Sequence, residues 1–378
     1  MQRSVLAGGA ALVFAGPALA HHGFGQFEMS KAVTYSGTIT GLDLVNPHSY
    51  LRFETTGADG QPFDMRCEMR AATLLRRSGW SVDQFTPGRH IVVTGHPHRE
   101  DSHSCYLETV RLGDSPPIDR NEQFSTGTVN TSNRPATLAS GVPNISGDWA
   151  VEEAVLTVPP GGGNGALVPK HLREAFASGK ITIQQIRAQN PRPSRPVYTA
   201  KGAAAAKAFK IWDPKDNPRL MCKPTSIVFD WTFDWPINRI TQTTAPNGER
   251  VINMEYGLYS YSRTIHMGET SHPADIKPSY AGNSIGHWEG NTLVVDTVGF
   301  TPGVLSPPTP SSDQLHVVER FTVDTKDWSL KREYTVTDPV YLAKPYSGSD
   351  MVYLSSVPFE RRPCKEETYE FLQDSGGR

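Results

Sequence analysis

Polar and apolar residues alternate with a period of two between Ala32 and Leu112, as they do in half-buried β-strands. Gly57–Gly60 and Pro87–Gly88 supply turn residues between these strands, and one short helix is expected over Ala71–Ser78. About five strands with one helix favour a small, partly open β-barrel of the OB type. The pattern marks strands at Val33–Ile39, Ser49–Glu54, His90–Thr94 and Tyr106–Val110.

The region after Cys222 repeats the strand pattern and follows two helical patterns, at His171–Gln189 and Ala200–Trp212. About eight antiparallel strands favour a closed barrel or a sandwich, because closure removes exposed sheet edges. We therefore expect a mainly β chain, in which the OB-like barrel precedes a larger antiparallel barrel or sandwich with two short helices. The strands expected in this region are Ser226–Trp231, Ile237–Thr243, Arg250–Tyr256, Leu258–Met267, Thr292–Val298, Val317–Val323, Leu330–Thr337 and Glu366–Phe371.

The composition changes between these two β regions. Residues 113–144 are rich in Ser, Thr, Asn and Pro and have almost no apolar periodicity, which is typical of a linker. We therefore expect a small β domain over residues 21–112, a linker over 113–144 and a larger β-barrel domain over 145–378.

Residues 1–20 have the features of a secretory signal peptide. Arg3 precedes the apolar run Val5–Phe14, and Ala18-Leu19-Ala20 matches an A-x-A cleavage site. A membrane anchor needs about 18 unbroken apolar residues, and Gly16-Pro17 interrupts this run. We expect a periplasmic or secreted protein whose mature chain begins at His21.

The charge balance narrows the choice of partners. The 378 residues carry 37 basic and 39 acidic side chains, a formal net charge of -2 with neutral histidines. Such a balance offers no general attraction to nucleic acid or to anionic lipid. No segment after the signal peptide is apolar enough to span a membrane, so we expect a small-molecule ligand or substrate as the partner.

Four cysteines in an exported chain favour disulfides, because the compartment is oxidising. Cys67 and Cys105 fall in the small domain, whereas Cys222 and Cys364 fall in the larger one. The pairing that respects the domains is therefore Cys67–Cys105 with Cys222–Cys364. Four buried free thiols are the alternative, and the spacings fit no zinc-ribbon pattern.

Several motifs carry a family resemblance. The small domain resembles uncharacterised exported bacterial domains whose mature chains begin with paired histidines and a nearby phenylalanine. The larger domain is similar to a second poorly characterised secreted family. The resemblances cover most of the mature chain and imply an architecture without a settled activity. The motifs that carry them are His21–Phe24, Asn46-Pro47-His48 and Leu75–Trp80 in the small domain, and Asn217–Cys222, His272-Pro273 and Ser284–Thr297 in the larger one.

The expected mature N-terminus is one candidate for chemistry. Cleavage before His21 leaves a free amine and an imidazole on one residue, which can chelate copper together with a second histidine. His22, His48 or the pair His96 and His98 can supply that histidine. The alternative is that these histidines are simply solvated.

The interior of the larger barrel is the second candidate. The period-two rule places Glu319 with Val317 and Phe321, and Arg263 with Tyr261 and Ile265, on the apolar faces of their strands. Both charges are then expected to point inward, where they are costly unless they are paired. They form either a structural ion pair or the wall of a ligand site, unless the strand parity is misassigned.

Further groups that can move protons lie near these strands in the sequence. His272 and Glu319 are the expected acid–base pair, with Arg263 holding an anionic or carbonyl group. Asp296 and Tyr280 complete the catalytic candidates. Turn, loop and solvent-facing positions explain the others without chemistry; they are His266, Asp275, His287 and Glu289.

We therefore expect a periplasmic or secreted enzyme that performs cofactor-independent acid–base chemistry of the isomerase, lyase or hydratase type in a barrel pocket. Two alternatives stay open: a copper-binding carrier or redox protein, and a barrel that only binds an apolar ligand. Trp231, Phe233 and Trp235 could line such a barrel. Motifs for phosphate loops, dinucleotide binding, nucleophile elbows, zinc helices and haem attachment are absent from the sequence, so nucleotide chemistry is disfavoured.

Overall fold

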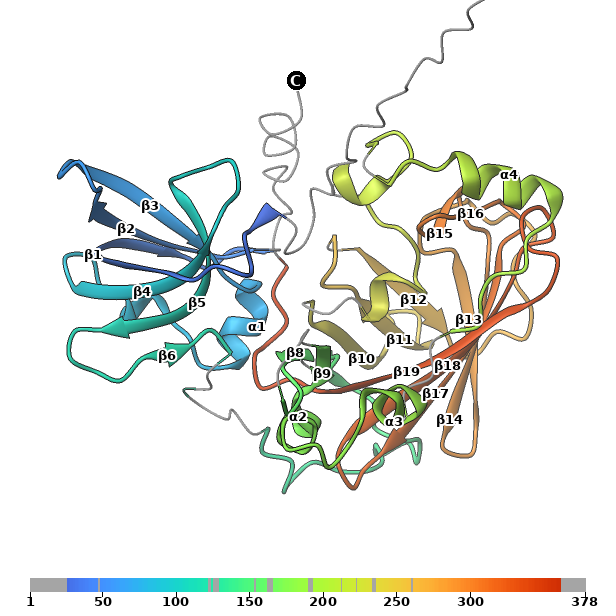
Figure 1. Cartoon of the computed structure of the whole chain (residues 1–378). Coiled ribbons are helices and arrows are strands. Elements are labelled where there is room, and N and C mark those ends of the chain that lie inside the picture. Colours follow the sequence, from blue (N-terminus) through green and yellow to red (C-terminus); the bar gives the residue numbers. More distant parts are fainter. Residues whose placement is uncertain are drawn as a thin grey trace, which may run out of the picture.

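Figure 1 shows the computed structural model of the chain, a mainly β protein as expected. The structure describes residues 26–46, 48–121, 124, 129–152, 154–161, 166–189, 193–211, 213–221, 223–232, 236–259 and 261–361. Several predictions lie outside the described residues; they are the signal peptide, His21, His22, Cys222, Phe233, Trp235, Cys364 and the strand Glu366–Phe371.

The described part of the first region forms a five-stranded barrel, called the small barrel below. The order around it is β3-β2-β1-β4-β5, and a parallel pairing of β3 with β5 closes the ring. Helix α1 (Ala72–Arg77) lies between β3 and β4 in the sequence. The strands are β1 (Val33–Asp43), β2 (Tyr50–Thr56), β3 (Pro62–Glu68), β4 (His90–Pro97) and β5 (Ser104–Leu112).

The Cys67–Cys105 disulfide is confirmed and lies on the β3–β5 seam. The two cysteines face each other in the parallel ladder, with their Cα atoms 4.4 Å apart, and both side chains are buried. The seam pairs only Arg66–Glu68 with Ser104–Tyr106, so the covalent bond reinforces the shortest junction of the ring. A short strand, β6 (Ile118–Asp119), pairs with β5 and lies within the segment expected to be a linker.

The described part of the second region forms a closed barrel of nine strands, called the large barrel below. Its order is β10-β11-β12-β13-β14-β17-β18-β19-β7. All neighbours are antiparallel except β12 and β13, which run parallel, so the expectation of a purely antiparallel barrel is wrong at this pair. The strands are β7 (Gly147–Ala150), β10 (Asn238–Thr244), β11 (Arg250–Glu255), β12 (Ser262–His266), β13 (Asn283–Glu289), β14 (Thr292–Val298), β17 (His316–Asp324), β18 (Ser329–Thr337) and β19 (Tyr346–Leu354).

The helices are shorter than the sequence pattern predicts. The expected helix over His171–Gln189 is broken because α2 ends at Ser178 and Gly179, where Gly179 adopts a φ of 74°. The second expected helix stops at Ala208 because Phe209 is extended. The helices are α2 (Arg173–Ala177), α3 (Ile183–Gln189) and α4 (Ala200–Ala208).

Short elements complete the described structure. Two small hairpins join β8 (Ala154–Thr157) to β9 (Ala166–Pro169) and β15 (Gly303–Ser306) to β16 (Thr309–Ser311). Single 3₁₀ turns lie at Val82–Gln84, Lys170–Leu172, Pro218–Met221 and Asp230–Thr232. Among the described helices, none has the length and apolarity needed to cross a bilayer.

The strand expected at Ser226–Trp231 is wrong, and this segment carries Asp230, a residue of the candidate site described below. This segment turns and ends in the 3₁₀ turn Asp230–Thr232, with Ile227 and Trp231 packed in the core of the large barrel. Apolar side chains that are surrounded on several sides produce a hydrophobic run without belonging to a strand.

Candidate functional site

Glu319 and Arg263 point into the large barrel, as their strand parity predicts. Glu319 of β17 and Arg263 of β12 are 0% and 4% exposed. Arg263 Nη1 donates to Glu319 Oε2 at 2.6 Å, so the two groups form a buried ion pair. Burial disfavours the charge on Arg263, but Glu319 outweighs burial and raises the pKa of the guanidinium.

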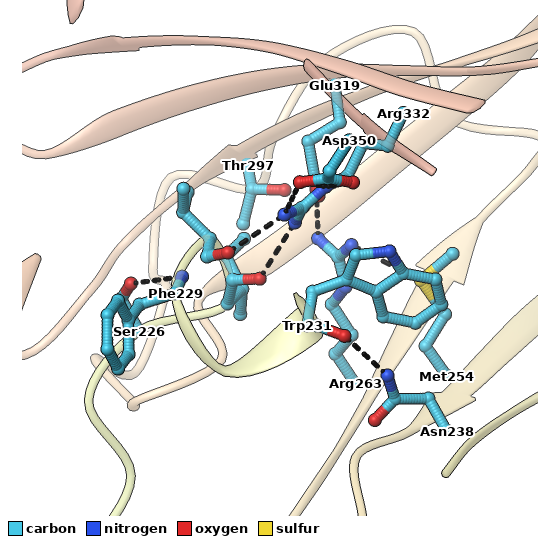
Figure 2. Close-up of polar contacts among 12 residues, drawn as sticks. Ser226, Phe229, Trp231, Asn238, Met254, Arg263, Thr297, Glu319, Arg332 and Asp350 are labelled. Atoms are coloured by element: carbon cyan, nitrogen blue, oxygen red, sulfur yellow. Dashed lines mark hydrogen bonds and ion pairs between the residues drawn. The ribbon is translucent and has the colours of Figure 1, made fainter. Parts of the chain in front are cut away.

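Two further charges, which the sequence analysis missed, extend this pair (Figure 2). Arg332 Nη1 donates to Glu319 Oε1 at 3.2 Å, and Arg332 Nη2 donates to Asp350 Oδ2 at 2.6 Å. Arg263, Glu319, Arg332 and Asp350 are called the buried charge network below. Arg332 lies on the same strand face as Leu330 and Tyr334, so the parity rule could have found it.

The buried charge network also holds a segment of backbone. Arg332 donates through Nη1 to the Ile227 carbonyl oxygen at 3.0 Å and through Nη2 to the Val228 carbonyl oxygen at 2.8 Å. Burial disfavours the charge on Arg332, but Asp350 and Glu319 outweigh burial and raise its pKa. The guanidinium therefore stays charged and fixes the segment that carries Asp230.

Two more side-chain contacts anchor that segment inside the large barrel. Ser226 Oγ donates to the Leu305 carbonyl oxygen at 2.6 Å, and Asn238 Nδ2 donates to the Trp231 carbonyl oxygen at 2.7 Å. Figure 2 shows Trp231 on this segment, with its carbonyl oxygen directed at Asn238. The segment is thus tied to strand β15 of the small hairpin before Asp230 and to barrel strand β10 after it.

Asp230 is a buried carboxyl that sequence analysis missed, because its segment was assigned to a strand. It is 0% exposed, and its Oδ2 accepts a hydrogen bond from the Thr225 backbone N–H at 2.9 Å. Its Oδ1 forms no well-aligned hydrogen bond in the described part of the chain, although the Thr225 and Tyr261 side chains lie near enough to the carboxyl to lower its pKa in part. Burial raises the pKa of Asp230 to about 7, so both protonation states are populated near neutrality.

Other buried polar atoms in this part of the large barrel also lack a well-aligned hydrogen bond. Within the described structure, the hydroxyls of Tyr256 and Tyr261, Trp231 Nε1 and Arg263 Nε are buried without a well-aligned hydrogen bond, and the Tyr261 hydroxyl lies near the Asp230 carboxyl. The rings of Tyr256 and Tyr261 stack with centroids 4.4 Å apart, and Trp231 packs edge-on against Tyr256 at 5.8 Å. With Asp230, these four residues are called the unpartnered cluster below.

Burial raises the pKa of both tyrosines in the unpartnered cluster. Their hydroxyls therefore stay protonated and can donate hydrogen bonds. Trp231 Nε1 and Arg263 Nε can only donate. The cluster thus presents several donors and one titratable carboxyl.

The structure does not bring His272 and Glu319 together. His272 Nε2 lies 2.9 Å from Asp296 Oδ1, and its Nδ1 lies 2.7 Å from Asn283 Oδ1. Glu319 pairs in register with Val295, whose side chain points inward, so Asp296 beside it faces outward. The wall of the barrel therefore separates the two groups, and the expected acid–base pair does not form.

Asp296 instead joins two histidines on the outside of the large barrel. Its Oδ2 lies 2.9 Å from His316 Nε2, while its Oδ1 contacts His272. Burial raises the pKa of Asp296, but hydrogen bonds from His272 and His316 outweigh burial and lower it. Tyr280 is 47% exposed, and in the described part of the chain it forms no hydrogen bond with this cluster.

The histidines proposed as copper ligands have other partners in the described structure. His48 Nδ1 lies 2.8 Å from Glu68 Oε1. His98 Nδ1 accepts hydrogen bonds from the backbone N–H groups of Glu100 and Asp101, so this nitrogen is unavailable to a metal. His96 Nδ1 lies 3.1 Å from the Lys31 carbonyl oxygen, and its Nε2 lies 3.9 Å from Glu108 Oε2.

Comparison with known proteins matches one part of the chain. Residues 10–106 match a family of unknown function (DUF6152). This stretch includes β1–β4 of the small barrel and the beginning of β5. No curated protein and no solved structure matches the chain.

Proposed function

We propose that the interior of the large barrel binds a small organic molecule and moves protons on it, with Asp230 as the acid–base group. The unpartnered cluster is the observation that carries this proposal. A buried polar group without a partner costs about 1 to 3 kcal/mol, and native proteins keep few of them. Several such groups side by side around one carboxyl favour a bound polar ligand as their partner.

Proton transfer is the chemistry that this set of groups supports best. Asp230 Oδ1 can remove a proton next to a carbonyl group, because near neutral pH part of the carboxyl is ionised. The Tyr256 and Tyr261 hydroxyls and Arg263 Nε can donate to the oxygen that gains charge. The same carboxyl can then return the proton to another atom, so no electron acceptor is needed.

This proposal changes the roles expected for the inward charges. Glu319 contacts Arg263 and Arg332 with its two carboxylate oxygens, so it acts as a positioning residue rather than as a base. Arg263 keeps its Nε for a ligand while its Nη1 is held by Glu319. The reaction class stays that of an isomerase, lyase or hydratase acting on a carbonyl compound.

We place this activity outside the cytoplasm. The signal-peptide pattern of residues 1–20 supports export. The buried Cys67–Cys105 disulfide is the second support, because disulfides persist in oxidising compartments.

Ligand capture followed by mass spectrometry tests the proposal. The wild-type protein is incubated with a small-molecule extract of bacterial cells, separated from free solute and analysed for bound compounds. We expect wild type to bind a carbonyl compound and to convert it into a product. Tyr261→Phe should retain this compound poorly. Asp230→Asn should bind the compound without converting it. Binding without turnover by wild type would favour the non-catalytic ligand-binding alternative. If no compound distinguishes wild type from Tyr261→Phe, the interior is not a ligand site.

A copper site at the start of the mature chain is the second candidate, and the position of Gln26 favours it. Gln26 Nε2 donates to Glu68 Oε2 at 3.5 Å, and the same carboxylate holds His48. The stretch from His21 to Gln26 spans at most about 18 Å. Roughly one copper per chain, lost in His21→Ala, is the expected result for exported protein. Correctly cleaved protein without copper would contradict this candidate.

A further inference from the structure

A second group of metal-binding side chains lies at one end of strand β12, on the outside of the large barrel. Glu249, His266 and Glu269 each offer one ligand atom, and these atoms lie within 4.8 Å of one another. His266 alternates with the buried Arg263 and Ile265 along β12, so its side chain faces outward. The three residues come from the β10–β11 turn, from β12 and from the turn after it.

We propose that Glu249, His266 and Glu269 bind one divalent metal ion of the zinc class. One imidazole and two carboxylates match the ligand types that zinc takes in sites with three protein ligands and one open position. Tetrahedral zinc–ligand bonds of about 2.0 to 2.2 Å place ligand atoms roughly 3.4 Å apart. His266 Nδ1 and Glu249 Oε1, which lie 2.8 Å apart, would therefore separate slightly on binding, and Glu269 would adjust to them. Glu269 is exposed, so its side chain can move the short distance required.

The charges around the site favour a cation. His266 Nδ1 lies 2.8 Å from Glu249 Oε1, and Glu269 adds a second carboxylate. Among the described residues, no lysine or arginine forms an ion pair with Glu249 or Glu269. Two carboxylates therefore share one imidazole without a guanidinium or ammonium group to balance them. A divalent ion supplies that missing charge.

A second histidine–glutamate pair on the same barrel has an arginine as its cation instead of a metal ion. His287 Nε2 lies 3.2 Å from Glu289 Oε1 on the neighbouring strand β13. Arg320 Nη2 donates to Glu289 Oε2 at 2.7 Å and is the main reason that the pKa of Glu289 is lowered. That carboxylate already has a cation, and among the described residues no third metal-ligating side chain joins the pair, so His287 and Glu289 provide a matched control.

Zinc titration by isothermal calorimetry tests the proposal on the tag-free, metal-stripped full chain. This site is separate from the acid–base proposal, so the test needs no substrate. We expect His266→Asn and Glu269→Gln each to weaken one zinc-binding event at least about tenfold. The control variants His287→Asn and Glu289→Gln should leave every binding event unchanged.

The variants are chosen so that a loss of zinc binding can be distinguished from a loss of folding. Glu269→Gln changes one exposed side chain and removes only its charge, and circular dichroism verifies the fold of all four variants. The proposal is overturned if wild type binds no zinc, or if His266→Asn and Glu269→Gln bind it as tightly as wild type. An equal loss in His287→Asn would attribute binding to surface histidines in general and would also overturn it.

Discussion

The interior of the large barrel holds two polar groups that differ in how their atoms are partnered. In the buried charge network, both oxygens of Glu319 and the terminal nitrogens of Arg332 contact opposite charges or carbonyl oxygens. In the unpartnered cluster, Asp230 Oδ1, both tyrosine hydroxyls, Trp231 Nε1 and Arg263 Nε form no well-aligned hydrogen bond in the described structure. Arg263 belongs to both groups. The first arrangement satisfies its polar atoms within the protein, and the second leaves hydrogen-bonding capacity unused.

Breaking the charge network should have the largest effect. Arg332→Met removes the partner of Glu319 and Asp350 and leaves the carbonyls of Ile227 and Val228 without donors. We expect a loss of about 3 to 5 kcal/mol in the free energy of unfolding, measured by urea denaturation. Arg320→Met on the same barrel breaks an exposed ion pair with Glu289 and should cost at most about 1 kcal/mol. Equal losses in the two variants would contradict the distinction.

Replacing the buried carboxyl should change how stability depends on pH. The pKa of Asp230 is about 7 in the folded protein against an ordinary value of 3.8, so the folded state holds the proton more tightly. The contribution of this carboxyl to the free energy of unfolding is therefore fully present below about pH 4 and is lost as the pH rises toward 7. Asp230→Asn cannot ionise and should be more stable than wild type at pH 8 by about 2 to 4 kcal/mol.

Urea unfolding of wild type and Asp230→Asn at pH 5 and pH 8 measures this effect. The gain from the substitution should be larger at pH 8 than at pH 5. A gain that is the same at both values would show that Asp230 titrates in its ordinary range. Such a result would also remove its role as an acid–base group at neutral pH.

The smallest effect should come from removing a hydroxyl without a partner. Tyr256→Phe deletes a buried oxygen that has no hydrogen-bond partner in the described structure. We expect unfolding free energy to stay within about 0.5 kcal/mol of wild type or to rise. Tyr198→Phe is the matched control, because the Tyr198 hydroxyl lies 2.8 Å from Thr309 Oγ1, and it should cost about 1 kcal/mol. Thermal unfolding measures the stability of both variants. A larger loss of stability in Tyr256→Phe than in Tyr198→Phe would contradict this prediction.

The sequence predicts the inward charges better than it predicts the site around them. The alternation of Glu319 and Arg263 with apolar neighbours is a local property, so the parity rule finds both residues without tertiary contacts. The same rule also identifies Arg332 once it is applied to β18. Asp230 is different, because its segment is not a strand and has no alternation of polar and apolar residues that gives side-chain direction. Contacts with residues distant in the sequence place this segment.

The expected pairing of His272 with Glu319 fails for a related reason. His272 lies in a loop between β12 and β13, where no periodic rule gives the direction of a side chain. The contact of His272 with Asp296 depends on how that loop returns across the barrel wall. Strand faces can therefore be predicted from the sequence, whereas contacts between loops and strands require the tertiary structure.

The disulfide on the β3–β5 seam makes a closed covalent ring of part of the small barrel. Cys67 and Cys105 are 38 positions apart, and the chain between them contains α1 and β4. A single peptide-bond cleavage anywhere between these cysteines leaves the two fragments covalently joined. The small barrel would thus stay tethered to the large one after a protease made such a cut.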